Sequence, residues 1–267
     1  MTTAPERLGE DLLRLAVEAA DLAAREHRSR PSELRVDTKS STTDPVTEVD
    51  RASERVIVDH LLAARPGDGV LGEEGSDVPS SSGVRWIIDP LDGTVNFMYG
   101  YPAYAVSIAA EVDGQVLAGV VHDSCRDEVF TAVRGRGARL GAAPIRANAP
   151  SALASSLLGT GFGYDPARRR WQADVLTGLI DVVRDIRRSG SAALDLCWVA
   201  CGRLDLFYEV GLNRWDVAAG ALIASEAGST ARWEPEVPRL LLAPPTLLAA
   251  FEAALSDAEK HAGPLPS

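Results

Sequence analysis

Apolar residues recur three or four positions apart near the start of the chain, which is the spacing of one face of an α-helix. They predict an amphipathic helix over about residues 5–28, through Leu8, Leu12, Leu15, Ala16, Ala19 and Leu22. The same period returns after residue 44 and predicts a second helix. Asp44 is expected to be its N-cap, with Pro45 at its first helical position.

Shorter apolar runs, bounded by Gly, Ser and Pro, predict strands at 70–72 and 85–88 and a meander of strands over 103–133. Beyond residue 150, strand-like and helix-like stretches alternate. The strands are expected at 156–160, 182–186, 204–208 and 239–242, and the helices at 167–181, 191–201, 215–227 and 245–260. Such a pattern is typical of sheets covered by helices, an α/β or α+β sandwich. We expect a single domain, 1–267, with two lobes of about 1–150 and 151–267.

The composition, 46% hydrophobic and 24% charged over 267 residues, is that of an ordinary globular protein. With 38 acidic against 27 basic residues the formal charge is −11, which disfavours binding to nucleic acid or to an anionic membrane. No run of 18 apolar residues predicts a membrane span, and the N-terminus lacks the basic start and apolar stretch of a secretory signal. Cys125, Cys197 and Cys201 are expected to be free thiols, so we expect a cytoplasmic protein.

The segment from Trp86 to Thr94 carries the most informative chemistry in the sequence. Its apolar start predicts a buried strand, which ends at Asp89 because Pro90 fixes a turn and Gly93 lets the backbone bend. Asp89 and Asp92 would then lie at the carboxyl end of a core strand, where α/β folds usually bind their ligands. An ordinary turn would explain the same residues, since Asp, Pro and Gly are common in turns.

Other carboxylates occupy similar places. Glu73 and Glu74 follow the strand expected at 70–72, and Asp216 stands at the start of a predicted helix. A solvated loop and a helix-capping acid are the simpler explanations. If these groups converge, a hard cation would remove their repulsion, and Mg2+ prefers such oxygen ligands. Two ions about 4 Å apart would suit displacement at phosphorus. The four histidines are scattered, and the glycines at 135–137 and 159–161 lack the spacing of a dinucleotide or Walker loop.

With these residues in view, the sequence closely resembles the inositol monophosphatase family. Residues 86–97 look like the first signature of that family and residues 215–220 like the second. The likeness extends from about Lys39 to Gly228. It is closest to bacterial inositol-1-monophosphatases, through residues 44–47, 159–164 and 190–195. The resemblance implies a layered α/β sandwich with the active site between its two lobes, and Mg2+-dependent hydrolysis of inositol 1-phosphate to myo-inositol and phosphate.

The resemblance also implies a set of two or three Mg2+ ions. Glu73, Asp89 and the Leu91 carbonyl would hold the first ion. Asp89, Asp92 and Asp216 would hold the second, and Glu73 would help to hold a weaker third ion through water. Lys39 matches a basic residue near this metal site.

The remaining roles come from the same comparison of motifs. Thr94 and Asp50 match the pair that orients and deprotonates the attacking water, and Glu73 belongs with them as a catalytic residue. Gly93 and Thr94 would donate backbone hydrogen bonds to the phosphate. Asp92 and Asp216 would also lie beside the phosphate, as substrate-binding residues. The alcohol side would be lined by Gly190, Ser191, Ala192 and Glu209. Simpler explanations are a solvated helix face for Asp50, an N-cap for Ser191 and a surface strand end for Glu209.

The expected partner is therefore a small phosphorylated polyol, and the expected assembly is a homodimer that is sensitive to lithium. Histidinol phosphate and fructose 1,6-bisphosphate are alternative substrates on the same scaffold, because the loops around 159–192 and 209–214 decide the alcohol. A regulatory interaction protein is the alternative from another class, since some bacterial relatives associate with transcription machinery. The intact set of carboxylates argues against a purely non-catalytic role.

Overall fold

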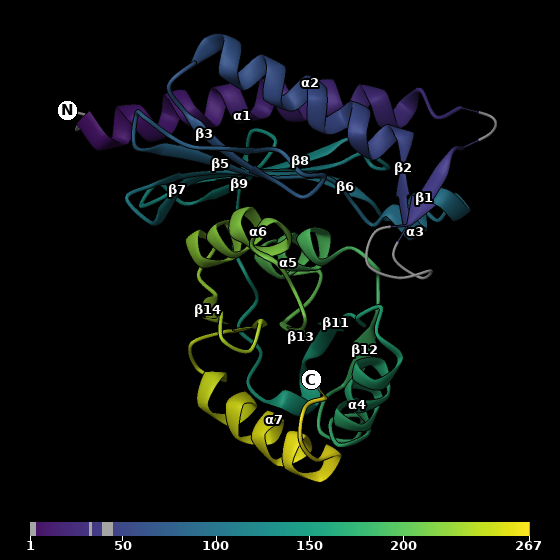
Figure 1. Ribbon diagram of the computed structural model, residues 1–267. Helices are drawn as coiled ribbons and strands as arrows, with labels where there is room; N and C mark the ends of the chain where they lie inside the picture. The colour runs from purple at the N-terminus through teal and green to yellow at the C-terminus, as the bar shows by residue number, and fades with distance from the viewer. Residues whose placement is uncertain (1–3, 32–33, 39–44, 267) are drawn as a thin grey trace.

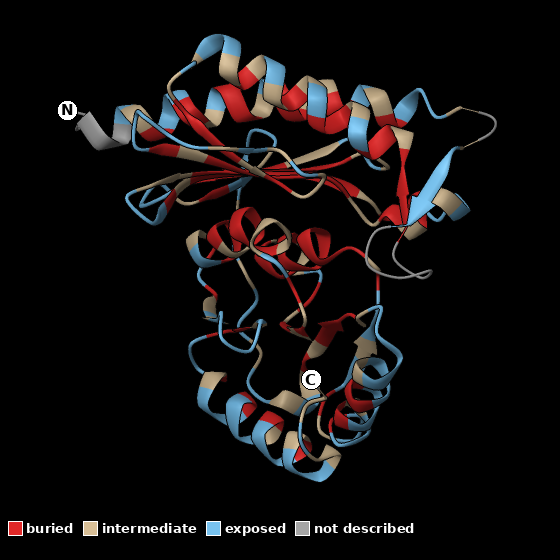
Figure 2. Cartoon of the chain, viewed as in Figure 1, coloured by how far each residue is buried: buried red, intermediate tan, exposed pale blue. Residues whose placement is uncertain are grey.

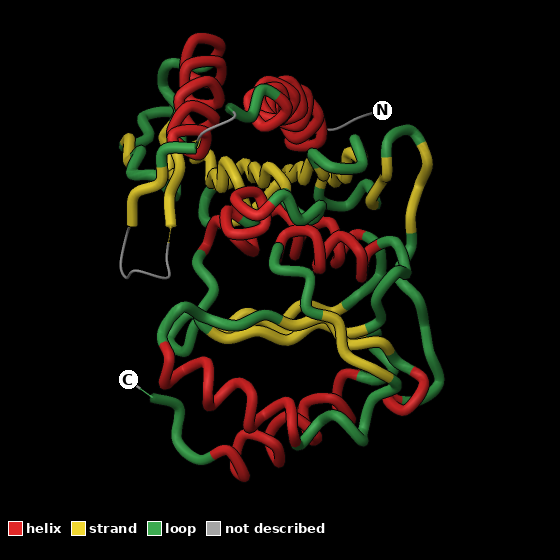
Figure 3. The backbone as a smooth tube through the Cα atoms, turned by 90° about the vertical axis from the view of Figure 1, so that its right-hand side faces the viewer, coloured by secondary structure: helices red, strands yellow, loops and turns green. Residues whose placement is uncertain are grey.

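Helices and sheets alternate in five layers in the computed structural model, which describes residues 4–31, 34–38 and 45–266 (Figures 1 and 3). Within these residues the α-helices are α1 (Ala4–Arg28), α2 (Glu48–Ala64), α3 (Thr94–Tyr99), α4 (Pro166–Thr177), α5 (Ala192–Ala200), α6 (Arg214–Glu226) and α7 (Leu248–Ala262), with a 3-10 turn at Leu153–Ser155.

The first sheet has the strand order β10-β9-β8-β7-β6-β5-β3-β4 and is antiparallel except for the parallel pair β3 and β5. Its strands are β3 (Gly69–Gly72), β4 (Asp77–Val78), β5 (Val84–Asp92), β6 (Ala105–Val112), β7 (Gln115–Asp123), β8 (Glu128–Val133), β9 (Ala138–Leu140) and β10 (Ala143–Ile145). A separate hairpin pairs β1 (Val36–Thr38) with β2 (Pro45–Thr47).

The second sheet has the order β12-β11-β13-β15-β14 and lies on the far side of α5 and α6. Its strands are β11 (Leu157–Thr160), β12 (Asp185–Arg187), β13 (Leu206–Val210), β14 (Thr230–Glu234) and β15 (Arg239–Ala243). The parallel pairs β11–β12 and β11–β13 place the carboxyl ends of these strands on the side that faces Asp92 and α5.

Burial explains which helices are amphipathic. The outer helices α1 and α2 pack one face on the first sheet, and α4 and α7 pack one face on the second (Figure 2). In contrast α5 and α6 lie between the two sheets, where one continuous core joins residues of both. Every residue of α5 except Trp198 is therefore buried, and its sequence is apolar almost all round, as expected for a helix covered on both faces.

Most of the predicted elements are confirmed, and their ends shift by a few residues. Two predictions are wrong. The strand expected to end at Asp89 continues through Pro90 to Asp92, with a register shift between Asp89 and Asp92 in place of a turn. In addition, α2 does not begin at Pro45, which instead belongs to the buried strand β2. Thr47 is the N-cap, because its side chain accepts hydrogen bonds from Val49 N and Asp50 N while its backbone N–H donates to the Asp50 carboxylate. Asp44 itself lies outside the described residues. The strand expected at 182–186 is also displaced, since β12 covers 185–187.

Two expectations about the whole chain can be compared with the described part. No helix there is long and apolar enough to cross a membrane. The three cysteines are free, as predicted, with Cys197 buried and Cys125 and Cys201 partly buried.

Candidate active site

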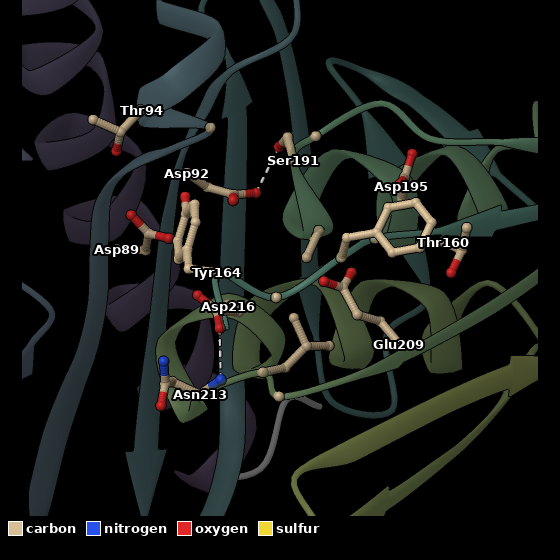
Figure 4. Close-up of a pocket in the computed structure, with 18 of the residues that line it drawn as sticks. Asp89, Asp92, Thr94, Thr160, Tyr164, Ser191, Asp195, Glu209, Asn213 and Asp216 are labelled. Atoms are coloured by element: carbon tan, nitrogen blue, oxygen red, sulfur yellow. Dashed lines mark hydrogen bonds between the residues drawn. The ribbon is translucent and has the colours of Figure 1, made fainter. Parts of the chain in front are cut away.

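A cavity of about 390 Å³ opens where the end of β5 meets the first turn of α5, the first turn of α6 and the second sheet (Figure 4). Most of the site residues predicted from the sequence line this cavity: Glu73, Asp89, Leu91, Asp92, Gly93, Thr94, Gly190, Ser191, Ala192, Glu209 and Asp216. Asp50 is behind its wall, in contact with Thr94. Lys39 lies outside the described residues. The fold thus gathers residues that are up to 143 positions apart in sequence, from Glu73 to Asp216.

Three carboxylates converge at one end of the cavity. Glu73 follows β3, Asp89 lies in β5 and Asp216 lies in the first turn of α6, and one oxygen from each can be chosen so that all lie within 4.8 Å. Burial raises the pKa of Asp89 well above its usual value, and the charges of Glu73, Asp92 and Asp216 raise it further. Burial likewise raises the pKa of Asp216. These groups repel one another when ionised, so the cluster fits a hard divalent cation.

Asp216 both caps α6 and belongs to the acidic cluster, two possibilities that the sequence left open. Its Oδ2 accepts a hydrogen bond from Asn213 N at 2.5 Å, which caps α6 (Figure 4). The same side chain still belongs to the acidic cluster, because a carboxylate has several lone pairs and the cap uses one oxygen. The cap fixes the side chain before any cation binds.

Asp92 connects the first sheet to α5. Its Oδ2 accepts hydrogen bonds from Ser191 Oγ at 2.5 Å and from Ala193 N at 2.7 Å. Burial raises the pKa of Asp92 to about 6, although these two hydrogen bonds favour the ionised form. Asp92 does not belong to the tightest acidic group of the described residues, and one of its oxygens is held by α5. Ser191 also accepts from Leu194 N, so it is an N-cap and a cavity residue together.

Thr94 and Asp50 form a buried pair beside the acidic cluster. Thr94 Oγ1 donates to Asp50 Oδ1 at 2.9 Å and lies 3.1 Å from the Leu91 carbonyl. The other carboxylate oxygen of Asp50 accepts from Thr47 N and Thr47 Oγ1. The simpler explanation for Asp50, a solvated helix face, therefore does not hold. Gly93 precedes Thr94 with a φ of 97°, a conformation that favours glycine and lets β5 turn directly into α3.

Glu209 lies in β13, apart from Asp89 and Asp216 in Figure 4 and toward Thr160. Its carboxylate rests on the backbone of Gly161, where a Cβ would come within 2.2 Å of Glu209 Oε2. The glycine in the 159–164 motif thus leaves space for this carboxylate. Burial and the charge of Asp92 raise the pKa of Glu209 to about 8, while Arg188 lowers it. The surface-strand explanation does not hold, since Glu209 lines the cavity.

Some cavity residues have no role in the sequence-based interpretation. Asp195 is 1% exposed in α5, and its Oδ1 has no hydrogen-bond partner. Burial raises the pKa of Asp195 well above its usual value. Arg168 and Arg188 also line the cavity and bring positive charge to an otherwise acidic wall. Only the 190–195 motif hinted at Asp195, and nothing in the sequence pattern singled out the two arginines from the other arginines beside them.

Comparison with known proteins shows the family of this chain. The model of the inositol monophosphatase family matches residues 9–261. The chain belongs to the inositol monophosphatase family. This confirms the resemblance that the two signature segments indicated, and the match covers both sheets and the helices between them.

Particular members of the family are strongly similar to this chain. Inositol-1-monophosphatase SuhB of Mycobacterium tuberculosis (strain ATCC 25618 / H37Rv) is 54% identical over 200 residues, 72% of this chain and 69% of that protein. Nus factor SuhB of Pasteurella multocida is 43% identical over 218 residues, 81% of each protein. The solved structure of Mycobacterium tuberculosis SuhB superposes with a TM-score of 0.81 and 43% identity, covering 95% of this chain and 97% of that one. The layered fold expected from the sequence is therefore confirmed.

Proposed function

We propose that this member of the inositol monophosphatase family is a Mg2+-dependent phosphatase whose preferred substrate is inositol 1-phosphate. The observation that carries the proposal is the convergence of Glu73, Asp89 and Asp216 in a cavity that also holds the Thr94–Asp50 pair. The names of the inositol-1-monophosphatase relatives support the substrate. Histidinol phosphate and fructose 1,6-bisphosphate are the alternative substrates.

The donor set fits Mg2+, because it consists of carboxylate and carbonyl oxygens with no nitrogen or sulfur ligand among the clustered residues. Glu73, Asp89 and the Leu91 carbonyl would hold one ion, and Asp89, Asp92 and Asp216 a second. Glu73 would help to hold a third through water. When bound, these ions supply positive charge to the phosphate and the leaving alcohol and make a nearby water more acidic.

Thr94 and Asp50 would align the water and take its proton. The Thr94 hydroxyl hydrogen points to Asp50 Oδ1, which leaves the lone pairs of Oγ1 free to accept a hydrogen bond from water. As the water attacks, Thr94 Oγ1 accepts its proton and passes its own to Asp50. Thr47 keeps Asp50 in place through two hydrogen bonds to Oδ2. The backbone N–H groups of Gly93 and Thr94 would donate to the phosphate.

The alcohol would lie between Gly190, Ser191, Ala192 and Glu209. All four line the cavity, and Glu209 is the acidic residue among them. A carboxylate accepts hydrogen bonds from adjacent hydroxyl groups, which a polyol offers and a simple aryl alcohol lacks. Glu209 is therefore the group that we expect to select for a polyol.

Glu209→Gln tests the polyol preference. At pH 9, above the pKa of about 8, wild-type Glu209 is ionised, and Gln replaces a charged acceptor by a neutral one. A hydrogen bond to a charged group contributes about 1.5–3 kcal/mol, so kcat/KM for inositol 1-phosphate should fall about 10- to 100-fold. The value for p-nitrophenyl phosphate should change much less. Glu236→Gln, on an exposed turn, is the matched control and should change neither.

Equal losses on the two substrates would show that Glu209 serves the cations or the fold and not the alcohol. Histidinol phosphate distinguishes the alternative, because its ammonium group would lose a direct charge partner. A larger loss on histidinol phosphate than on inositol 1-phosphate would make the amine the preferred ligand of this pocket.

Phosphate release from inositol 1-phosphate, histidinol phosphate and fructose 1,6-bisphosphate is the direct test of the proposed activity. We expect the highest kcat/KM on inositol 1-phosphate, loss of activity in EDTA with recovery in Mg2+, and inhibition by Li+. Full activity in EDTA would contradict the proposed cation dependence. A higher kcat/KM on either of the other compounds would identify that compound as the preferred substrate. The proposed reaction, hydrolysis of a phosphate monoester, would be unchanged.

A regulatory role through protein contacts is the second candidate function, and the name Nus factor SuhB of one relative supports it. The complete carboxylate set in a cavity favours catalysis as the primary function. The family resemblance makes a homodimer the expected assembly for either function.

A further inference from the structure

A buried carboxylate outside the cavity holds the loop that carries Glu73. Glu54 lies in α2 and is 4% exposed. Its Oε2 accepts a hydrogen bond from Glu74 N at 2.8 Å, and its Oε1 accepts from Ser76 N at 3.0 Å and from Ser76 Oγ at 2.7 Å. Three donors of one short loop therefore converge on one side chain.

The loop between β3 and β4 contains the first residue of the acidic cluster. Glu73 is joined by one peptide bond to the nitrogen of Glu74 that Glu54 holds. At the start of the loop, Gly72 N donates to the Ser76 carbonyl at 2.7 Å, and Glu73 N donates to the Ile88 carbonyl at 3.1 Å. The peptide units on both sides of Glu73 are thus fixed, one by β5 and the other by Glu54.

Gly72 leaves the space that this carboxylate occupies. A Cβ at position 72 would lie 2.3 Å from Glu54 Oε2 and 2.6 Å from its Cδ, which is far inside van der Waals contact. A side chain at position 72 would therefore displace the Glu54 carboxylate from its present place. Gly72 and the Glu54 carboxylate therefore pack directly against each other, although the two residues are 18 positions apart in sequence.

The helix connects this loop to the Thr94–Asp50 pair. Asp50 and Glu54 are four residues apart in α2, so both lie on the helix face that is turned to the end of the first sheet. Asp50 accepts from Thr94, and Glu54 accepts from the Glu73 loop. One rigid helix face thereby fixes the positions of two parts of the site relative to each other.

We infer that Glu54 is a positioning residue, which preorganises Glu73 to bind a divalent cation. The inference rests on the proposed cation site and assigns Glu54 no contact with the substrate or the ion. Groups that orient a ligand of a cation typically change metal affinity about 10- to 100-fold when they are replaced. A carboxylate suits this loop best, because an amide in either orientation would turn its NH₂ group toward a backbone N–H, that of Glu74 or that of Ser76.

Calorimetric titration of the metal-free protein with Mg2+ tests the inference without measuring turnover. Glu54→Gln should raise the dissociation constant for Mg2+ by about 10- to 100-fold. Ser76→Ala removes one of the three donors and should raise it by a smaller factor in the same direction. Gly72→Ala should act like Glu54→Gln, because the added methyl group displaces the carboxylate. Asp59→Asn, on the exposed side of the same helix, is the matched control and should leave the constant unchanged.

Thermal unfolding of each metal-free variant separates positioning from folding. If Glu54→Gln fails to fold, Ser76→Ala carries the test, since it removes only a partly buried hydroxyl group. Wild-type Mg2+ affinity in both variants would overturn the role of Glu54 and leave the cation site in place. No Mg2+ binding by the wild-type chain would refute the cation site itself, and the role of Glu54 with it.

Discussion

We expect Asp89→Asn to lower Mg2+-dependent phosphate release by about 10³-fold or more. Asp89 is buried in β5, and its carboxylate is the member of the acidic cluster that would contact both principal cations. Asn keeps the shape, and its oxygen can still accept from Leu91 N, as Asp89 does at 3.0 Å. It removes the charge, however. Loss of several kcal/mol of transition-state stabilisation gives a factor of this size, because about 1.4 kcal/mol is tenfold.

The stability of the same variant shows whether the loss is chemical. In EDTA at neutral pH, Asp89→Asn should unfold at a higher temperature than the wild type, because one of three mutually repelling carboxylates has gone. Mg2+ should stabilise the wild type by binding the native state and should stabilise the variant much less. Asp77→Asn, exposed in β4, is the control and should alter neither measurement. A folded Asp89→Asn protein with near wild-type activity would refute the assignment of Asp89 to the cations.

The acidic edge of the first sheet is predictable from sequence because its central residues are neighbours in the chain. A buried strand that ends in Asp89-Pro90-Leu91-Asp92-Gly93 restricts the backbone strongly, since proline fixes one φ angle and glycine adopts a positive one. Glu73 and Asp216 are also predictable as acids at the ends of elements. Glu73 meets Asp89 because β3 pairs with β5, and Asp216 meets them because α6 packs against the sheet. Periodicity alone specifies neither of these contacts.

Glu54 illustrates what the sequence pattern hides. The helical spacing places Glu54 on the same side of α2 as Ile57 and Leu61, three and seven residues further on, but it does not say which donors meet the carboxylate there. Only the tertiary fold shows that the loop after β3 crosses this face and covers the carboxylate. The edge strand β14 was missed for a related reason: its residues are half-buried or exposed, so they lack the apolar alternation of a strand with a buried face.

The Thr94–Asp50 pair should contribute to the chemical step much more than to binding. The two residues are 44 positions apart and meet through a single hydrogen bond, from Thr94 Oγ1 to Asp50 Oδ1. Thr94→Val keeps the buried shape and removes the hydroxyl group, and Asp50→Asn removes the charge. Each should lower kcat by about 10²–10⁴-fold, the usual range for lost acid–base assistance, with a smaller change in KM. Thr94→Ser restores the hydroxyl group and should recover most of the activity.

The double variant decides whether these residues act together. If Thr94 Oγ1 takes the proton from water only because Asp50 accepts its own, removing either partner already stops the relay. Thr94→Val/Asp50→Asn should then be little slower than the slower single variant, and the double-mutant cycle should give a coupling energy close to the smaller single effect. If the two residues contributed independently, the fold-losses in kcat of the two single variants would instead multiply in the double variant. Because Asp50 also accepts hydrogen bonds from Thr47 at the start of α2, unfolding temperatures must accompany the rates. Multiplicative losses in fully folded variants would show that Thr94 and Asp50 serve the reaction separately.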